Sequence, residues 1–235
     1  TTLTVPCPRS MPTGELPSVL IYTLHDDNVG IVPQLETQPL HELTLDLRKH
    51  GWAGFQTRHW LMSDHDPCVA YLARAAWDRD VTPESAYAEQ VRCLCGPEAV
   101  GPMLEAFGLV EEATQLLEEH ELGFTFAVHG MMMKHWTAGS LSDELRTVRE
   151  LYRRAEDRVR TAHDATLRYG PELSYTGSWI NRLAFGRLYI DAVEQVREAA
   201  TAESEGSPLK AAESAGAALA CAREALGAFA RAVQD

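Results

Sequence analysis

The fold of this chain is decided by the stretch from Ser18 to Trp60, which reads SVLIYTLHDDNVGIVPQLETQPLHELTLDLRKHGWAGFQTRHW. Two short apolar runs, Val19 to Leu24 and Trp52 to Phe55, are each followed by a polar cluster. Between them, Pro39 suits the first turn of a helix and Gly51 suits the position just past its end. The stretch therefore predicts a strand, a helix and a second strand.

Two strands joined by one helix form a βαβ unit, so the strands should be parallel and the crossover right-handed. Parallel strands end at the same edge of a sheet. The polar residues that follow them, 25–28 and 56–60, should therefore meet at the carboxyl edge. In parallel α/β folds, ligands and catalytic groups sit at this edge.

Composition limits the classes of function that the chain can have. The 235 residues carry a formal net charge of −13, which argues against a nucleic-acid partner and against binding to an anionic membrane surface. No apolar run has the length of a transmembrane helix, and the amino end lacks a signal-peptide pattern. The cysteines are odd in number and scattered, which favours reduced thiols in the cytoplasm: Cys7, Cys68, Cys93, Cys95 and Cys221.

The chain divides into three parts. Residues 1–17 are rich in Pro, Ser and Thr and predict an extended lead-in. Residues 18–80 predict two β/α repeats, the second ending in a helix over Cys68 to Trp77. Residues 81–235 contain no strand pattern and predict an α-helical domain, a bundle of about five helices. The fold class is thus α/β followed by all-α, and predominantly helical overall.

Two helix starts in the second half carry clear signals. Thr82 before Pro83 predicts an N-cap and a first-turn proline. Ser140 with Asp143 predicts a capping pattern at the start of a long helix. That helix has a coiled-coil-like seam with alternating three- and four-residue spacing: Leu145, Val148, Tyr152, Ala155, Val159, Ala162, Thr166 and Tyr169.

Two β/α repeats cannot cover both faces of their own sheet, and parallel sheets have more strands than two. The first residue is Thr rather than Met. We therefore expect the chain to be the end of a longer α/β protein. The missing strands would come from an upstream segment, from another chain or from a swapped copy.

Three segments carry a family resemblance: GWAGFQTRHW (51–60), VAYLARAAWD (69–78) and TPESAYAEQV (82–91). Together they resemble the end of the (β/α)8 barrel in bacterial glycoside hydrolases, namely the alpha-glucuronidases and their barrel relatives. The resemblance implies a TIM-like barrel whose seventh and eighth strands are residues 19–24 and 53–58, followed by a helical domain. It also implies a glycosidase that needs no cofactor. The strands that carry the general acid in that family have no counterpart here.

Glycosidases use two carboxylates that flank the scissile bond, and this chain offers candidates for one of them. Asp26 and Asp27 follow the first strand and are the candidate catalytic residues. The alternative is that they cap a turn. His25 could bind a sugar hydroxyl or orient one of the aspartates, or it could be a strand-end residue without a catalytic role.

Arg58, His59 and Trp60 follow the second strand and are the candidate substrate-binding residues. Arginine forms bidentate pairs with carboxylates, which suits an acidic sugar. Trp60 could stack on a pyranose ring. The alternative pairs Arg58 with Asp26 or Asp27 and leaves Trp60 in packing, but a polar cluster on both strands at one edge favours binding.

Other clusters do not predict a metal site. Asp64, His65 and Asp66 suit a solvated loop whose last residue caps a helix, and Cys93 and Cys95 suit buried thiols. The His- and Met-rich segment 129–136 suits core packing. Two rival hypotheses remain: a helical metal protein, and a non-enzymatic assembly module or inactive fragment. The module would self-associate as a homo-oligomer through the seam over residues 145–169.

Overall fold

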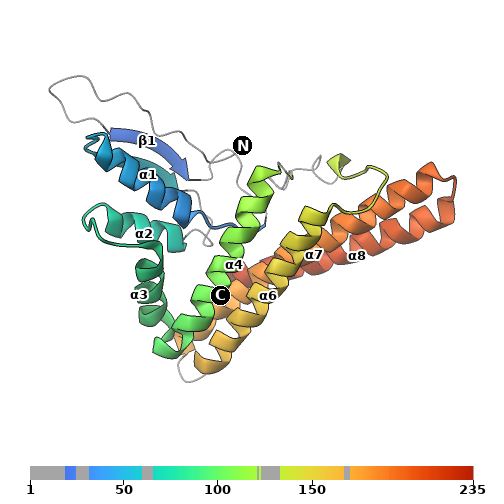
Figure 1. Cartoon of the computed structure of the whole chain (residues 1–235). Helices are drawn as coiled ribbons and strands as arrows, with labels where there is room; N and C mark the ends of the chain where they lie inside the picture. The colour runs from blue at the N-terminus through green and yellow to red at the C-terminus, as the bar shows by residue number, and fades with distance from the viewer. Residues whose placement is uncertain are drawn as a thin grey trace.

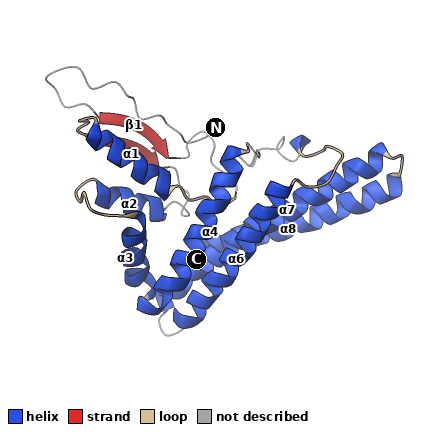
Figure 2. Cartoon of the chain, viewed as in Figure 1, coloured by secondary structure: helices blue, strands red, loops and turns tan. Residues whose placement is uncertain are grey.

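The computed structural model describes residues 19–24, 32–59, 66–120, 122, 133–166 and 170–234. Helices dominate these residues, as Figure 2 shows, so the prediction of a predominantly helical chain is confirmed. The amino-terminal part alternates strands and helices (Figure 1): β1 Val19–Leu24, α1 Thr37–Lys49, β2 Gly54–His59, α2 Asp66–Ala75 and α3 Pro83–Cys95.

β1 and β2 are parallel neighbours, as the βαβ pattern predicts. Val19 pairs with Gly54 at one end of the register and Leu24 pairs with His59 at the other. Within the described ranges the sheet consists of these two strands. The described sheet does not show the barrel that the family resemblance implies.

The predicted punctuation of α1 is confirmed. Pro39 lies in its first turn, and Gly51 just beyond its end has φ 72°, a left-handed conformation that favours glycine. Arg48 in the last turn donates to the backbone carbonyls of Ala75 and Asp78, the latter at 3.1 Å. These bonds attach the end of α1 to the end of α2.

The start of α3 also follows its sequence signal. Thr82 is the N-cap, and its hydroxyl accepts from the backbone N–H of Ser85 at 3.2 Å while Ser85 Oγ accepts from the Thr82 N–H at 3.0 Å. Together they make a capping box. Gly96 ends the helix, and a 3₁₀ turn, η2 Pro97–Ala99, leads into α4 Val100–Glu119.

Three long helices complete the described fold: α6 Asp143–Thr166, α7 Gly170–Ser204 and α8 Pro208–Gln234. The predicted cap of α6 was placed two residues too early. Ser142 rather than Ser140 supplies the hydroxyl, which accepts from the backbone N–H of Leu145 at 3.2 Å. Figure 1 shows α7 and α8 as a hairpin that extends beyond α6, on the side of the molecule away from β1 and α1.

The predicted seam of α6 lies inside the molecule. Its described members are all buried, between α4 on one side and α7 on the other: Leu145, Val148, Tyr152, Ala155, Val159, Ala162 and Thr166. The proposal that copies of the chain associate through this seam is therefore wrong, because the seam is already occupied by the chain's own helices. Tyr169 lies outside the described residues.

The two cysteines that were predicted to be buried thiols differ in exposure. Cys95 is buried as predicted, but Cys93 is exposed, because residues two apart on a helix point in different directions.

None of the helices within the described ranges combines the length and apolarity that crossing a membrane requires.

Candidate functional site

The candidate residues Arg58 and His59 are the last two residues of β2, so they lie within the strand and not after it as predicted. Arg58 pairs with Thr23 and His59 with Leu24, so the backbone of the second polar cluster does lie beside the end of β1. This is the edge at which parallel sheets place their functional groups. His25, Asp26, Asp27 and Trp60 lie outside the described residues.

Beyond β1 the described chain resumes at Val32, in a segment whose six residues are all buried. We call residues 32–37 the clamped segment. The Tyr152 hydroxyl on α6 donates to the carbonyl of Pro33 at 2.7 Å, and the backbone N–H of Leu35 donates to Thr114 Oγ1 on α4 at 2.9 Å. The helices of the carboxyl-terminal part thus hold the segment that leads into α1.

A buried polar network continues this contact at the start of α1. The backbone N–H of Thr37 and the hydroxyl of Tyr87 both donate to Glu111 Oε1, at 3.2 and 2.6 Å. Thr37 Oγ1 also contacts the Tyr87 hydroxyl, and it lies 3.2 Å from Cys68 Sγ. Glu111 on α4 therefore satisfies one of the free N–H groups at the amino end of α1, a role that the N-cap Glu36 does not take.

Burial keeps the acids of this network protonated to a higher pH than usual. The pKa of Glu36 is well above its ordinary value because of desolvation, with repulsion from Glu118 and Glu111 adding to the effect. Desolvation also raises the pKa of Glu111, although the hydrogen bonds from Tyr87 and Thr37 oppose it. Both effects follow from placing carboxyl groups where their charged form is poorly solvated.

The thiol and the phenol of the network are also held in their neutral forms. Burial raises the pKa of the Cys68 thiol and of Tyr87. A thiol with a raised pKa is a poor nucleophile. The hydrogen bonds of this network hold the start of α1 against α3 and α4.

An open groove of about 480 Å³ lies over this network, between α1 and α4. Glutamates dominate its polar lining, which consists of Glu36, Glu42, Glu111, Glu112, Glu118, Glu119, Gln38, Gln115 and Thr114. The described ranges contain no group of three or more His, Cys, Asp or Glu side chains arranged to hold a metal ion.

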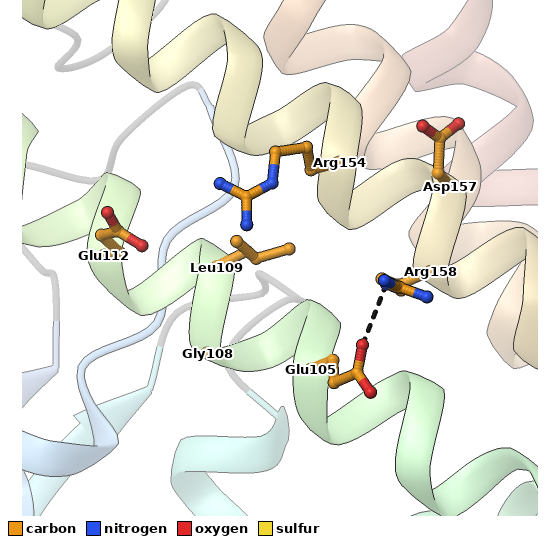
Figure 3. Close-up of a pocket in the computed structure, with 7 residues that line it drawn as sticks. All are labelled: Glu105, Gly108, Leu109, Glu112, Arg154, Asp157 and Arg158. Atoms are coloured by element: carbon orange, nitrogen blue, oxygen red, sulfur yellow. Dashed lines mark ion pairs between the residues drawn. The ribbon is translucent and has the colours of Figure 1, made fainter.

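A second groove, of about 540 Å³, lies on α4 toward α6 and is shown in Figure 3. Arg158 from α6 reaches Glu105 on α4 across it, with 2.9 Å between Nε and Oε2. Gly108 and Glu112 line both grooves, so the two lie next to each other on α4. A Cβ added at Gly108 would meet no atom within 4 Å.

Sequence reasoning did not identify the buried network as a functional unit. Its members come from α1, α2, α3 and α4, and up to 74 positions separate hydrogen-bonded partners. Single Thr, Tyr and Glu residues at such separations form no motif. The one signal available in the sequence was local. A helix with Pro39 in its first turn has free backbone N–H groups at its amino end, and these groups need hydrogen-bond acceptors.

Two other predicted clusters are only partly described. Asp66 begins α2, and its carboxylate accepts from the side-chain amide of Gln90 at 2.8 Å. In the His- and Met-rich segment, His135 is buried as the core-packing prediction requires. Trp136 is exposed, and its indole N–H donates to Glu203 on α7 at 3.0 Å.

Comparisons with protein families, with curated protein sequences and with solved structures give no match. The description of the site therefore depends on the residues of this chain alone. Its two parts are the carboxyl edge of β1 and β2 and the clamped segment that leads into α1.

Proposed function

We propose that this chain forms part of a carbohydrate-active hydrolase, a glycosidase whose sugar site lies at the carboxyl edge of β1 and β2. The observation that carries the proposal is the parallel register that ends at Thr23–Arg58 and Leu24–His59. It places Arg58 and His59, the last two residues of β2, beside the end of β1, so the cluster that follows β1 leaves from the edge at which they lie.

The incomplete burial of β2 supports the proposal that further strands complete the sheet into a TIM-like barrel. Gln56 is exposed, and its neighbours Phe55 and Thr57 are only partly buried. Strands of a parallel sheet are normally covered on both faces, and an unpaired edge invites another strand. The remaining strands would come from an upstream segment or from another chain.

The chemistry assigned to the edge is that of glycoside hydrolysis. Asp26 or Asp27 supplies one of the two carboxylates, and the general acid belongs to the strands that complete the sheet. Arg58 pairs with the carboxylate of an acidic sugar. His59 and His25 bind hydroxyl groups, and Trp60 stacks on the ring. The scattered, odd cysteines suit a cytoplasmic setting for this enzyme.

The clamped segment gives the helical part a role in this function. Tyr152 and Thr114 hold residues that lie close in sequence to the candidate carboxylates. Side chains that act on a substrate need a rigid support. The helical domain is thus proposed to hold the β1–α1 connection so that the carboxylates stay in place.

The test is the substitution Arg58→Ala in the complete enzyme, purified with whatever completes the sheet. The Michaelis constant for a glucuronide should rise about tenfold to a hundredfold, because a charged hydrogen-bonded pair is lost, while that for the matching glucoside changes little. Arg92→Ala, at an exposed arginine of α3, is the matched control. Equal Michaelis constants for the Arg58→Ala variant and the parent would remove Arg58 from the site.

A further inference from the structure

The last helix, α8, packs mainly on one neighbour, α7. The contact uses small side chains spaced three and four residues apart, namely Ser214, Ala218, Cys221, Ala225, Ala228 and Ala232. Small residues let the two helices approach closely. Phe185 on α7 and Phe229 add an aromatic contact, with 5.3 Å between ring centroids.

The opposite face of α8 repeats the same spacing with larger side chains. We call it the outer seam: Leu209, Ala212, Gly216, Leu219, Arg223, Leu226 and Ala230, all of them exposed. Leu209, Leu219 and Leu226 are 82%, 52% and 63% exposed. Exposed leucines on a seam with alternating three- and four-residue spacing match the pattern by which helices pair lengthwise.

We propose that the outer seam pairs with the outer seam of a second copy of this chain, with the two α8 helices antiparallel about a two-fold axis between residues 217 and 218. In a two-fold interface, residue i of one copy meets residue j of the other, and j meets i. The seam must therefore be complementary to its own reverse, and the sequence of α8 meets this condition.

The position of the two-fold axis determines which residues of the two outer seams face each other. Leu209 faces Leu226 of the second copy, and Leu219 faces Gly216 of the second copy. Large side chains thus meet either each other at the ends or a residue without a side chain near the centre. Each contact occurs twice because of the symmetry.

Charge selects the antiparallel arrangement. Arg223 faces Ala212 of the second copy, and the next residue of that copy is Glu213. The Glu213 carboxylate can therefore accept hydrogen bonds from the Arg223 guanidinium. Neither Arg223 nor Glu213 has an ion-pair partner within the part of the chain that the structure describes. A parallel pair would instead place Arg223 against Arg223, which like-charge repulsion disfavours.

Gly216 fits the same arrangement. A Cβ added there would meet no atom within 4 Å, so nothing inside the chain requires glycine. Glycine in a helix interior is otherwise unfavourable relative to alanine. In the proposed dimer, the missing side chain leaves room for Leu219 of the second copy.

The experiment is sedimentation equilibrium of the full chain from micromolar to near-millimolar concentration. The parent should reach twice the chain mass of 26.0 kDa. Arg223→Glu and Glu213→Arg should each weaken the dimer about tenfold or more by placing like charges together. The double variant should recover most of the loss because the charges are then exchanged. Arg92→Glu, on the exposed face of α3, should leave the dimer unchanged.

A second variant keeps the proposal testable if charge effects are masked by salt. Gly216→Leu should abolish the dimer while circular dichroism and thermal unfolding of the monomer stay intact, because the monomer has space for the side chain. A chain that stays monomeric at every concentration overturns the proposal. So does a dimer that Gly216→Leu leaves intact, or one that the double charge variant fails to restore.

Discussion

The helices α6 and α8 have the same three-and-four spacing of apolar residues, but they use it in opposite ways. In α6, the seam with the large side chains faces α4 and α7, and Tyr152 and Val159 are fully buried. In α8, the leucines Leu209, Leu219 and Leu226 face outward, and the side that packs on α7 carries mostly small residues together with Phe229. The spacing shows that each helix has a face for packing, but it does not show whether that face packs inside the chain.

The opposite faces of the two helices confirm this difference. The outer face of α6 carries charges that satisfy one another, such as Arg153, which binds Glu150 at 2.6 Å and Asp157 at 2.9 Å. The outer face of α8 carries leucines instead. A helix that is apolar on two faces needs two partners, and the chain itself supplies α8 with one.

The largest difference between the two helices should come from truncating one large side chain in each. Tyr152→Ala should lower the free energy of unfolding by about 3–5 kcal/mol, the range for deleting a buried aromatic ring. Leu226→Ala, at a residue 63% exposed, should change it by no more than about 0.5 kcal/mol. Urea unfolding at dilute, monomeric concentrations measures both. Similar losses for the two variants would mean that α8 is covered from within the chain.

The next largest effect is on how the free energy of unfolding varies with pH, which should differ between a buried carboxyl group and an exposed one. Because the folded-state pKa of Glu36 is raised, the neutral group favours the folded state. That contribution is fully present below the unfolded pKa, about 4.5, and is lost as pH rises toward the folded value. The Glu36→Gln variant does not have this loss. Its free energy of unfolding, relative to that of the parent, should therefore increase as pH rises above about 4.5.

Urea unfolding between pH 4 and about pH 8 measures this slope, and the exposed Glu213→Gln on α8 is the control. Glu111 and Glu118, the two acids that repel Glu36, are retained in both variants, and Glu36→Gln also removes their repulsion from Glu36. A stability difference between Glu36→Gln and the parent that does not vary with pH would contradict the buried, neutral form of Glu36.

The smallest effect should have opposite signs at two helical glycines. A Cβ at Gly186 would lie 2.9 Å from Pro33 Cδ and 3.0 Å from Tyr152 Cε2. Gly186→Ala should therefore be destabilising by about 1 kcal/mol, because overpacking outweighs the gain in helix propensity. Gly216→Ala, which has free space, should be stabilising by up to about 1 kcal/mol. Thermal unfolding of the two variants measures the signs, and a gain at Gly186 would mean that the clamped segment is loosely held.

Local and periodic features of the fold were predictable from the sequence. Pro39 and Gly51 delimit α1 closely, and Thr82 caps α3 as predicted, because caps depend on residues only a few positions apart. The parallel pairing of β1 and β2 followed from one helix lying between two apolar runs. The buried seam positions of α6 followed from their spacing.

Features that depend on contacts distant in the sequence were not predictable. Glu111 caps α1 from 74 positions away, and Tyr152 bonds Pro33 across 119 positions, so no local pattern marks either residue. The assignment of the seam of α6 to self-association failed for a related reason. Spacing defines a packing face without naming its partner, and only the folded chain shows that α4 and α7 already cover it.

The central claim is that the seam of α6 packs within the chain while the outer seam of α8 packs between chains. Cysteine cross-linking tests it most directly, in a background with Cys7, Cys93 and Cys221 replaced by serine. Leu209→Cys with Leu226→Cys should give a disulfide-linked dimer under mild oxidation, because the two positions face each other across the proposed axis.

Leu209→Cys alone should stay unlinked, because its two copies would lie about 26 Å apart in an antiparallel pair. Val148→Cys in the buried seam of α6 should stay unlinked as well. Cross-linking of Leu209→Cys alone would indicate a parallel pair, and no cross-linking of the double variant would show that α8 does not meet a second copy. Either result contradicts the account.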